Sequence, residues 1–442
     1  MQSRLTPPTD EQRALLDERR LIEPPPAARS EAQRDRDRIL YCSALLRLGH
    51  VTQVAAPEIG HTFHSRLTHS LKVAQVARGL ARRFKQEAVA GALGPNATRL
   101  VAALDEDATE AAALAHDIGH PPFGHLAEQV LQVRSAPVAT FEGNPQSFRI
   151  VTRLALRSGE MVGLNLTRRT LNGLLKYPWR HAEDPPLRAE KWGAYDGDMD
   201  YFDWVRQHSP KDRRTLEAEL MDWADDVTYA VHDMDDFYRA GLVPLERLTT
   251  SATERAEFDT YVLARHGATD GERLAQAAER LFESLLASVT TRFAGLAEER
   301  INMRVVGSAL ISRYIDAPTL TDDGEDVVLE IGQEMKDEVT VLKDLTWCYI
   351  IERPSLAVIQ EGHRRIIDAL YTMYRDALKA DRLSLFPPAF RERASAAGSA
   401  AESERVVIDM IAGMTEVSAT ELYKQHLGVA HGSLVSHASG PG

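Results

Sequence analysis

Apolar residues recur at helical spacing in three long stretches of the chain. The first covers 67–84, with lysine and arginine on the opposite face of the predicted helix. Its apolar positions are Leu71, Val73, Ala74, Val76, Ala77, Leu80, Ala81 and Phe84. Thr68, ahead of most of this run, fits a helix cap. The alanine-rich stretch 106–118, which ends before Gly119, and the stretch 215–238 predict two further helices.

Most of the remaining chain also favours helices. Further helical patterns cover 252–300, 336–351, 355–378 and 403–423. Two short runs, 304–309 and 327–331, have the composition of strands. The stretch 178–212 is rich in proline, glycine, aspartate and aromatic residues, and predicts an irregular loop. We find no internal repeat, so the predicted fold class is all-α.

The two ends of the chain depart from this helical pattern. Residues 1–30 are polar and interrupted by prolines, and they predict a mobile or surface-draped segment. The final stretch, 431–442, is predicted to be a flexible tail.

Composition and charge narrow the class of protein. The chain has 442 residues, 44% hydrophobic and 26% charged, which is ordinary for a globular protein with a large core. Its two cysteines, Cys42 and Cys348, lie in apolar runs and fit buried thiols in a reducing compartment. With no secretory signal and no apolar run near the roughly 20 residues of a membrane helix, we expect a cytoplasmic protein without membrane contact.

The acidic surface limits which partners the whole molecule attracts. A net charge of −13 does not favour a broad nucleic-acid interface. An anionic substrate would therefore need a local cationic site, made by a metal ion or by a few arginines.

One stretch concentrates histidines with acids: AHDIGHPPFGHLAE, residues 115–128. The adjacent pair His116 and Asp117 follows a buried-looking alanine-rich segment, where unpaired polar groups are costly. A divalent cation would satisfy both groups, and imidazole with carboxylate suits Mn, Fe, Co, Ni or Zn. Two ligands do not make a stable site.

Two more candidate ligands lie on the other long helices. His69 begins the first helix and Asp225 lies in the middle of the third. Three helices could bring all four side chains into the interior of a bundle. Each residue also has a simpler interpretation, because His69 fits a helix-start or core histidine and Asp225 fits a solvated acid.

These strings resemble a known family. The 115–128 string, preceded by RLTHSLKVAQVAR (66–78) and followed by ADDVTYAVHDMDD (224–236), resembles the deoxyguanosine triphosphate triphosphohydrolase-like proteins. These are HD-domain enzymes that split a dNTP into a deoxynucleoside and tripolyphosphate. Further matches in the family's order are RDRDRI (34–39), TQV (52–54), FEGNPQ (141–146) and KWGAY (191–195). An HD pair alone is a weak signal, whereas the long string with both flanking segments is specific.

The resemblance implies an HD-domain helical bundle over 31–245. It also implies a helical region over 246–430 that completes the pocket and the oligomer contacts. The metal ligands would be His69, His116, Asp117 and Asp225. His125 would be the catalytic histidine, with Glu128 orienting it. His120 would lie beside them, either in catalysis or as a structural hydrogen-bonding residue.

The resemblance also implies a set of substrate-binding residues. Arg66 would bind phosphate, and Gln53, Tyr229 and Asp233 would form the sugar pocket, with Asp233 at the 3′-hydroxyl. Asn144 would be a second pocket residue.

Two positions depart from the family pattern. A basic residue often precedes the TQV string in relatives, whereas Gly49, His50 and Val51 stand here. Some relatives have a lysine directly after the last metal ligand, where this chain has Asp226.

We therefore expect a dNTP triphosphohydrolase of nucleotide metabolism, with one divalent transition metal such as manganese and with Mg²⁺ as a further option on the nucleotide. The alternatives are an HD nucleotidase or phosphodiesterase acting on another phosphoester, and a non-catalytic nucleotide sensor. The basic runs 34–38 and 82–83 fit either a nucleotide or single-stranded DNA effector, or simply solvated helix faces. Relatives commonly form tetramers or hexamers, so a homo-oligomer is expected.

Overall fold

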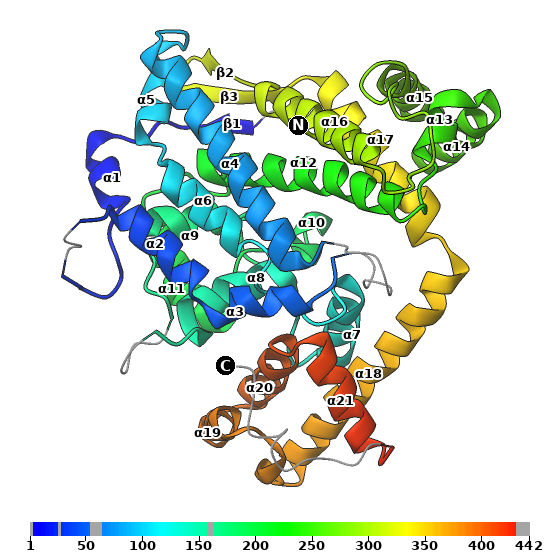
Figure 1. Ribbon diagram of the computed structural model, residues 1–442. Helices are drawn as coiled ribbons and strands as arrows, with labels where there is room; N and C mark the ends of the chain where they lie inside the picture. The colour runs from blue at the N-terminus through cyan, green and yellow to red at the C-terminus, as the bar shows by residue number, and fades with distance from the viewer. Residues whose placement is uncertain (1–2, 25–27, 54–63, 158–162, 430–442) are drawn as a thin grey trace.

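A computed structural model describes residues 3–24, 28–53, 64–157 and 163–429. The described part of the chain is mostly helical, with one small sheet (Figure 1). This confirms the predicted all-α class. In the described part of the chain, no helix is long and apolar enough to cross a membrane.

Five helices pack around one another and form the centre of the molecule (Figure 1). They are α2 (Glu31–Leu40), α4 (Arg66–Val89), α6 (Glu106–Ala115), α9 (Arg168–Leu174) and α12 (Leu216–Arg239). The apolar positions predicted for 67–84 are buried on α4, except that Leu71 is exposed. Ser65, and not Thr68, caps α4, because its hydroxyl accepts a hydrogen bond from the Thr68 amide. Asp105 and Thr215 cap α6 and α12 in the same way.

Seven further helices of the described chain surround this centre. They are α1 (Asp10–Leu15), α3 (Ser43–Arg47), α5 (Pro95–Ala103), α7 (His125–Ser135), α8 (Gly143–Arg149), α10 (Pro186–Glu190) and α11 (Met199–Arg206). The prediction of an irregular loop over 178–212 is wrong for α11, whose side chains Tyr201, Phe202 and Val205 are buried at helical spacing.

The second half of the chain forms two groups of helices. The first group lies near α12 (Figure 1) and consists of α13 (Leu245–Thr250), α14 (Ala252–His266), α15 (Ala268–Glu283), α16 (Ala297–Asp316) and α17 (Gln333–Thr346). The second group, here called the C-terminal lobe, consists of α18 (Pro354–Lys379), α19 (Pro388–Ala396), α20 (Ala400–Ala412) and α21 (Glu416–His426). The helix predicted over 403–423 is thus divided, at Gly413, into α20 and α21.

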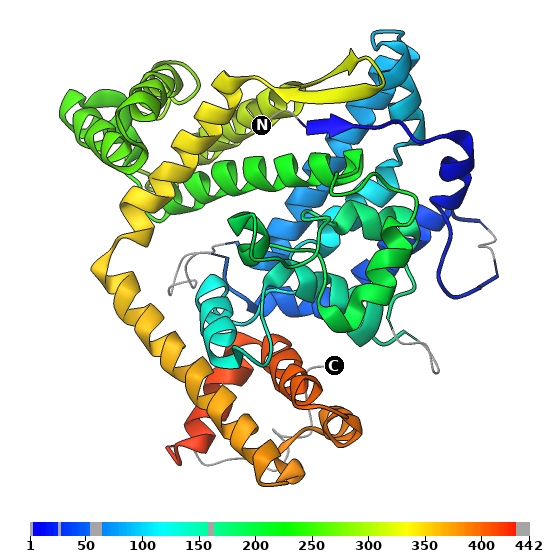
Figure 2. The ribbon, with the colours of Figure 1, turned by 180° about the vertical axis from the view of Figure 1, so that it is seen from behind.

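The C-terminal lobe has a hydrophobic core of its own. Side chains of α18, α20 and α21 pack there with Ala127, Val130 and Leu131 of α7. Figures 1 and 2 show α18 as a long helix that connects α17 to the other helices of the lobe, with α7 at its side. The helix that begins at His125 therefore packs against the C-terminal lobe.

The small sheet joins the N-terminal segment to residues 318–331. Its strands, β1 (Ser3–Leu5), β2 (Pro318–Asp323) and β3 (Asp326–Ile331), are antiparallel in the order β1-β3-β2. The strand predicted over 327–331 is confirmed. The strand predicted over 304–309 is wrong, because these residues lie in α16, which buries Met303, Val306 and Leu310 at helical spacing.

The N-terminal segment contains regular structure that the sequence pattern did not predict. Ser3–Leu5 pairs with β3, α1 follows, and Arg19 forms an ion pair with the buried Asp35. These long-range contacts hold the segment to the fold, and a local sequence pattern does not reveal them. The predicted tail, 431–442, lies outside the described residues.

Candidate metal centre and active site

Three helices bring the four predicted metal ligands together. His69 lies in the first turn of α4, His116 and Asp117 follow α6, and Asp225 lies in the middle of α12. The Nε2 atom of His69 is 3.0 Å from Asp225 Oδ1, and His116 Nε2 is 3.6 Å from the same oxygen. The ligand atoms that His69, His116 and Asp117 offer all lie within 4.8 Å of one another.

The contacts of His116 fit a metal ligand. Its Nδ1 is 2.7 Å from the carbonyl oxygen of Ala113, which keeps a hydrogen on that nitrogen. Its Nε2 is buried, has no hydrogen-bond partner among the described residues, and lies 3.3 Å from Asp117 Oδ1. An imidazole held through one nitrogen, with the other aimed at carboxylates, is the usual arrangement of a histidine on a metal ion.

The charges of the cluster favour a cation. Burial raises the pKa of Asp117 and Asp225, but neighbouring cationic side chains reverse this and hold both pKa values well below the ordinary range. Burial lowers the pKa of His116, but Asp117 and Asp225 outweigh it and raise that pKa to about 9. The cluster thus holds a proton strongly, and a divalent cation bound by the same atoms would replace it.

Arg66 lies against the metal cluster. Its side chain is buried, and Nη1 donates a hydrogen bond to Asp117 Oδ2 at 2.8 Å. Gly124 has a φ of +57°, and a Cβ there would lie 2.9 Å from Arg66 Nη2. Glycine at this position therefore allows both the positive φ of the turn and the close approach of the guanidinium group.

The predicted catalytic residues adjoin the cluster through His120. Its Nδ1 is 3.1 Å from Asp117 Oδ1, and its Nε2 is 3.6 Å from Glu128 Oε1. On the other side, His125 Nδ1 is 2.9 Å from Glu128 Oε2. Burial raises the pKa of Glu128, but His120 and His125 lower it to about 2, so this carboxylate is ionised. His120 thus lies between the metal cluster and the His125–Glu128 pair.

His125 differs from its neighbours in exposure. Its side chain is 70% exposed, while that of Glu128 is 11% exposed. A turn over 118–125, in which Phe123 has a φ of +67°, delivers His125 to the start of α7. The imidazole is therefore held at Nδ1 by a buried carboxylate and leaves the rest of its ring open to a ligand.

The predicted sugar-pocket residues include two unpaired acceptors. Within the described part of the chain, Gln53 Oε1 and Asp233 Oδ2 are buried without a hydrogen-bond partner. Burial is the main reason why the pKa of Asp233 lies well above its ordinary value, and the nearby carboxylate of Asp236 raises it further. Asp225, Tyr229 and Asp233 are spaced by four residues on α12 and share one face of that helix.

Asn144 is engaged with a neighbour. Its backbone amide and its side-chain amide both donate to the Glu142 carboxylate, at 2.7 and 2.8 Å. The preceding residue, Gly143, lies so close to Glu128 that a Cβ would be 2.5 Å from Glu128 Oε1. Asn144 therefore lies near the catalytic pair, with its amide hydrogens committed to Glu142.

Two lysines near the site were not predicted from the sequence. Lys176 Nζ is 2.6 Å from Asp222 and 3.4 Å from Asp225 Oδ2, and Lys191 Nζ is 2.6 Å from Glu142 Oε1. Burial lowers the pKa of Lys176, but Asp222 and Asp225 raise it well above the ordinary value. Lys191 lies in the KWGAY string, which matches the family pattern, so the sequence could have identified it as a site residue. Lys176 had no such signal, because it follows α9 and meets α12 only in the fold.

The basic runs that could have bound an effector are paired within the molecule. Arg34 and Arg38 contact Glu23, Arg36 contacts Asp107, and Arg82 contacts Glu106. These ion pairs favour the structural interpretation of the two runs.

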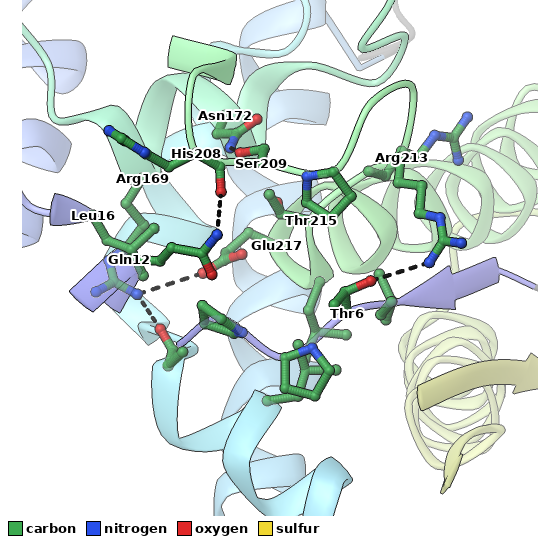
Figure 3. A pocket seen from close by; sticks show the side chains of 18 of the residues that line it. Thr6, Gln12, Leu16, Arg169, Asn172, His208, Ser209, Arg213, Thr215 and Glu217 are labelled. Atoms are coloured by element: carbon green, nitrogen blue, oxygen red, sulfur yellow. Dashed lines mark hydrogen bonds and ion pairs between the residues drawn. The ribbon is translucent and has the colours of Figure 1, made fainter. Parts of the chain in front are cut away.

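A cavity of about 350 Å³ lies away from these residues, between the N-terminal segment and the start of α12 (Figure 3). Figure 3 shows Gln12 directed at His208 and Arg169 beside Glu217 across this cavity. None of the described site residues named above lines it.

Comparisons with known proteins assign the chain to a class of enzyme. The HD domain model matches residues 66–230, and the phosphohydrolase-associated domain model matches 329–425. The fold and the HD match define the class, a phosphohydrolase whose His/Asp cluster can hold a divalent metal ion.

The relatives narrow this class. A deoxyguanosinetriphosphate triphosphohydrolase-like protein of Streptomyces coelicolor is 36% identical over 428 residues, covering 90% of this chain and 93% of that protein. Proteins with the same name from Corynebacterium efficiens and Ralstonia pickettii are each 34% identical, with coverage of 91% and 89% of this chain and 92% and 87% of theirs. The chain belongs to the deoxyguanosinetriphosphate triphosphohydrolase-like family, and the resemblance found in the sequence is confirmed.

Proposed function

We propose that this protein is a metal-dependent triphosphohydrolase that converts a dNTP and water to a deoxynucleoside and tripolyphosphate. The observation that carries the proposal is the continuous path of side chains from the metal cluster to His125. Asp117 contacts His120, His120 adjoins Glu128, and Glu128 holds His125. A structural metal site has no need of an ionised Glu128 or of an exposed histidine on it.

His69, His116, Asp117 and Asp225 would hold the metal ion. A divalent transition metal bound there supplies a Lewis acid for an α-phosphate oxygen and lowers the pKa of a bound water. The donor set of two imidazoles and two carboxylates suits Mn, Fe, Co, Ni or Zn, and Mg²⁺ would accompany the nucleotide.

The residues of the chain would bind and orient the triphosphate. Arg66 is held by Asp117 through Nη1, and its Nε has no hydrogen-bond partner among the described residues. A guanidinium group fixed in this way binds and orients a phosphate group more sharply than a lysine does. Lys176 adds positive charge beside Asp225, and Lys191 adds positive charge beside Glu142.

His125 would handle the proton. Water attacks the α-phosphorus, the bond from phosphorus to the 5′-oxygen breaks, and that oxygen takes up a proton as the deoxynucleoside leaves. The contact from His125 Nδ1 to Glu128 leaves Nε2 as the atom that transfers the proton.

Gln53, Tyr229, Asp233 and Asn144 would surround the deoxynucleoside. The unpaired oxygens of Gln53 and Asp233 are suited to sugar hydroxyls, with Asp233 at the 3′-position. Tyr229, one helical turn beyond Asp225, would form the wall at the 2′-position.

The test is to incubate the purified protein with each dNTP and Mn²⁺ and to separate the products by ion-exchange chromatography. We expect a deoxynucleoside and intact tripolyphosphate, and neither product from the His125→Ala variant. Release of pyrophosphate or of single phosphate would instead identify a nucleotidase or phosphodiesterase. No turnover of any dNTP, alone or mixed, would favour a nucleotide sensor.

A further inference from the structure

The first residue of α21, Glu416, joins two loops of the proposed active site. Its Oε1 accepts hydrogen bonds from the backbone amides of Thr52 at 2.9 Å and Phe123 at 3.2 Å. Its Oε2 accepts a third bond from the Thr52 hydroxyl at 2.7 Å. One carboxylate of the C-terminal lobe therefore holds segments that are about seventy residues apart in the sequence.

Both segments carry candidate site residues next to the contact. Thr52 precedes Gln53, and it forms an antiparallel bridge with Ser65, the residue that caps α4 just before Arg66. Phe123 lies in the 118–125 turn, two residues before His125. A displacement of Glu416 would therefore move both a sugar-pocket residue and the catalytic histidine.

Other contacts from the same lobe support the 118–125 turn. The ring of Phe123 stacks on His363 of α18, with centroids 4.1 Å apart. Arg47 bonds the Met414 carbonyl at 3.0 Å, and its Nη2 donates to the carbonyls of Ile118 at 2.9 Å and His120 at 2.7 Å. The turn is therefore held by the C-terminal lobe at the amide and ring of Phe123, and by Arg47 of α3 at two backbone carbonyls.

The metal cluster has no such support from the lobe among the contacts of the described residues. His69 and Asp225 lie on α4 and α12, and His116 directly follows α6; these three helices pack on one another. Loss of the Glu416 contact should consequently leave metal binding intact while it disturbs the His125 side of the site.

We propose that Glu416 is a positioning residue that couples the phosphohydrolase-associated region to catalysis by fixing the Thr52–Gln53 segment relative to the 118–125 turn. The expected effect on kcat rests on the proposed function. The expected protection of the Thr52 and Phe123 backbone amides from hydrogen exchange does not depend on the substrate. Effective placement of reacting groups is worth large rate factors, so a loop displaced by a fraction of an ångström lowers kcat.

The experiment compares Glu416→Ala, Glu416→Gln and the matched control Glu421→Ala. Glu421 is on the same helix, is half-exposed, and pairs only locally with Lys424. Each full-length variant is loaded with Mn²⁺ and compared for metal content, for kcat and KM on the best dNTP, and for hydrogen–deuterium exchange.

We expect Glu416→Ala to lower kcat by about tenfold to a hundredfold, the range for losing hydrogen bonds to a charged group. Its metal content should match the parent, and exchange should rise in both the 48–53 and the 118–124 segments. Glu416→Gln should recover most of the activity, because its amide oxygen can still accept from the two backbone amides. Glu421→Ala should behave as the parent.

Two results would overturn the proposal. One is unchanged exchange in both segments of Glu416→Ala. The other is exchange that rises equally throughout the C-terminal lobe, which would mean that Glu416 only stabilises the fold. If the parent hydrolyses no dNTP, the proposed function fails on that ground, while the exchange and metal measurements still decide whether Glu416 holds the two loops.

Discussion

The metal cluster and the His125 side of the site are built in different ways. The four candidate ligands come from α4, α12 and the end of α6, which belong to one hydrophobic core. His125 begins α7, whose apolar face lies in the core of the C-terminal lobe. The cluster is mostly buried, whereas the His125 side chain is largely exposed.

Metal binding and proton transfer are therefore supported by different parts of the fold. A metal site needs fixed donor atoms and little water, which closely packed helices provide. A proton-transfer group must reach the substrate, so it stands on a turn whose position other elements decide. We therefore expect changes in the two regions to affect different measurements.

The largest effect should follow from removing a ligand. His116→Ala deletes the unpaired Nε2 and leaves Asp117 and Asp225 facing each other without it. We expect metal content to fall toward zero and activity to drop at least about a thousandfold, as the loss of Lewis-acid stabilisation requires. Elemental analysis with a hydrolysis assay measures both. A variant that keeps its metal would remove His116 from the ligand set.

The next effect separates chemistry from metal binding. His125→Ala should lower kcat by roughly a hundredfold to ten-thousandfold, the usual contribution of a positioned acid or base. Its metal content should equal that of the parent, since His125 contacts Glu128 and His120 and no candidate ligand. Loss of metal together with activity would contradict the division between the two regions.

A third change tests attachment of the C-terminal lobe without touching the 118–125 turn. Asp409 of α20 is buried and pairs with Arg149 of α8 and with Arg393. Asp409→Asn should lower the free energy of unfolding by roughly 2 to 4 kcal/mol at pH 7, because two partly buried arginines lose the charge of their buried partner. At a temperature where the variant is folded, kcat should stay within about threefold of the parent. Urea unfolding and steady-state kinetics check the two expectations.

The difference in stability between the parent and Asp409→Asn should depend on pH in one direction. Burial raises the pKa of Asp409, but Arg149 and Arg393 outweigh it and lower that pKa. The stabilisation is then fully present above the unfolded value of about 3.9 and is lost as the pH falls through the lowered folded-state pKa. The gap in stability between parent and Asp409→Asn should therefore shrink below about pH 4. A gap that grows on acidification would contradict this assignment.

The smallest change concerns selectivity. Tyr229→Ala should relax discrimination between deoxyribose and ribose triphosphates by about tenfold, since an apolar wall distinguishes a hydroxyl only modestly. Metal content should not change, because Tyr229 lies a helical turn away from Asp225. Competition between dNTP and NTP measures the ratio, and equal selectivity in variant and parent would remove Tyr229 from this role.

The local strings located much of the candidate site. The HDIGHPPFGH string and its two flanking helices named His69, His116, Asp117 and Asp225, and the fold brings all four together. They were recognisable because helical periodicity and adjacent motifs are local properties of a chain. The same local view predicted a strand over 304–309 that is a helix, and it missed α11 within 178–212 and the regular structure of the N-terminal segment. At these places burial against distant elements decides the structure.

The sequence by itself determined the all-α class, the family and the identity of the candidate ligands. Only the tertiary structure decided that Lys176 meets Asp225, that Arg47 and Glu416 hold the 118–125 turn, and that α7 packs in the core of the C-terminal lobe. The physical reason is that these are contacts between segments far apart along the chain. Their partners are chosen by how helices pack, and no periodicity or motif in either segment records that choice.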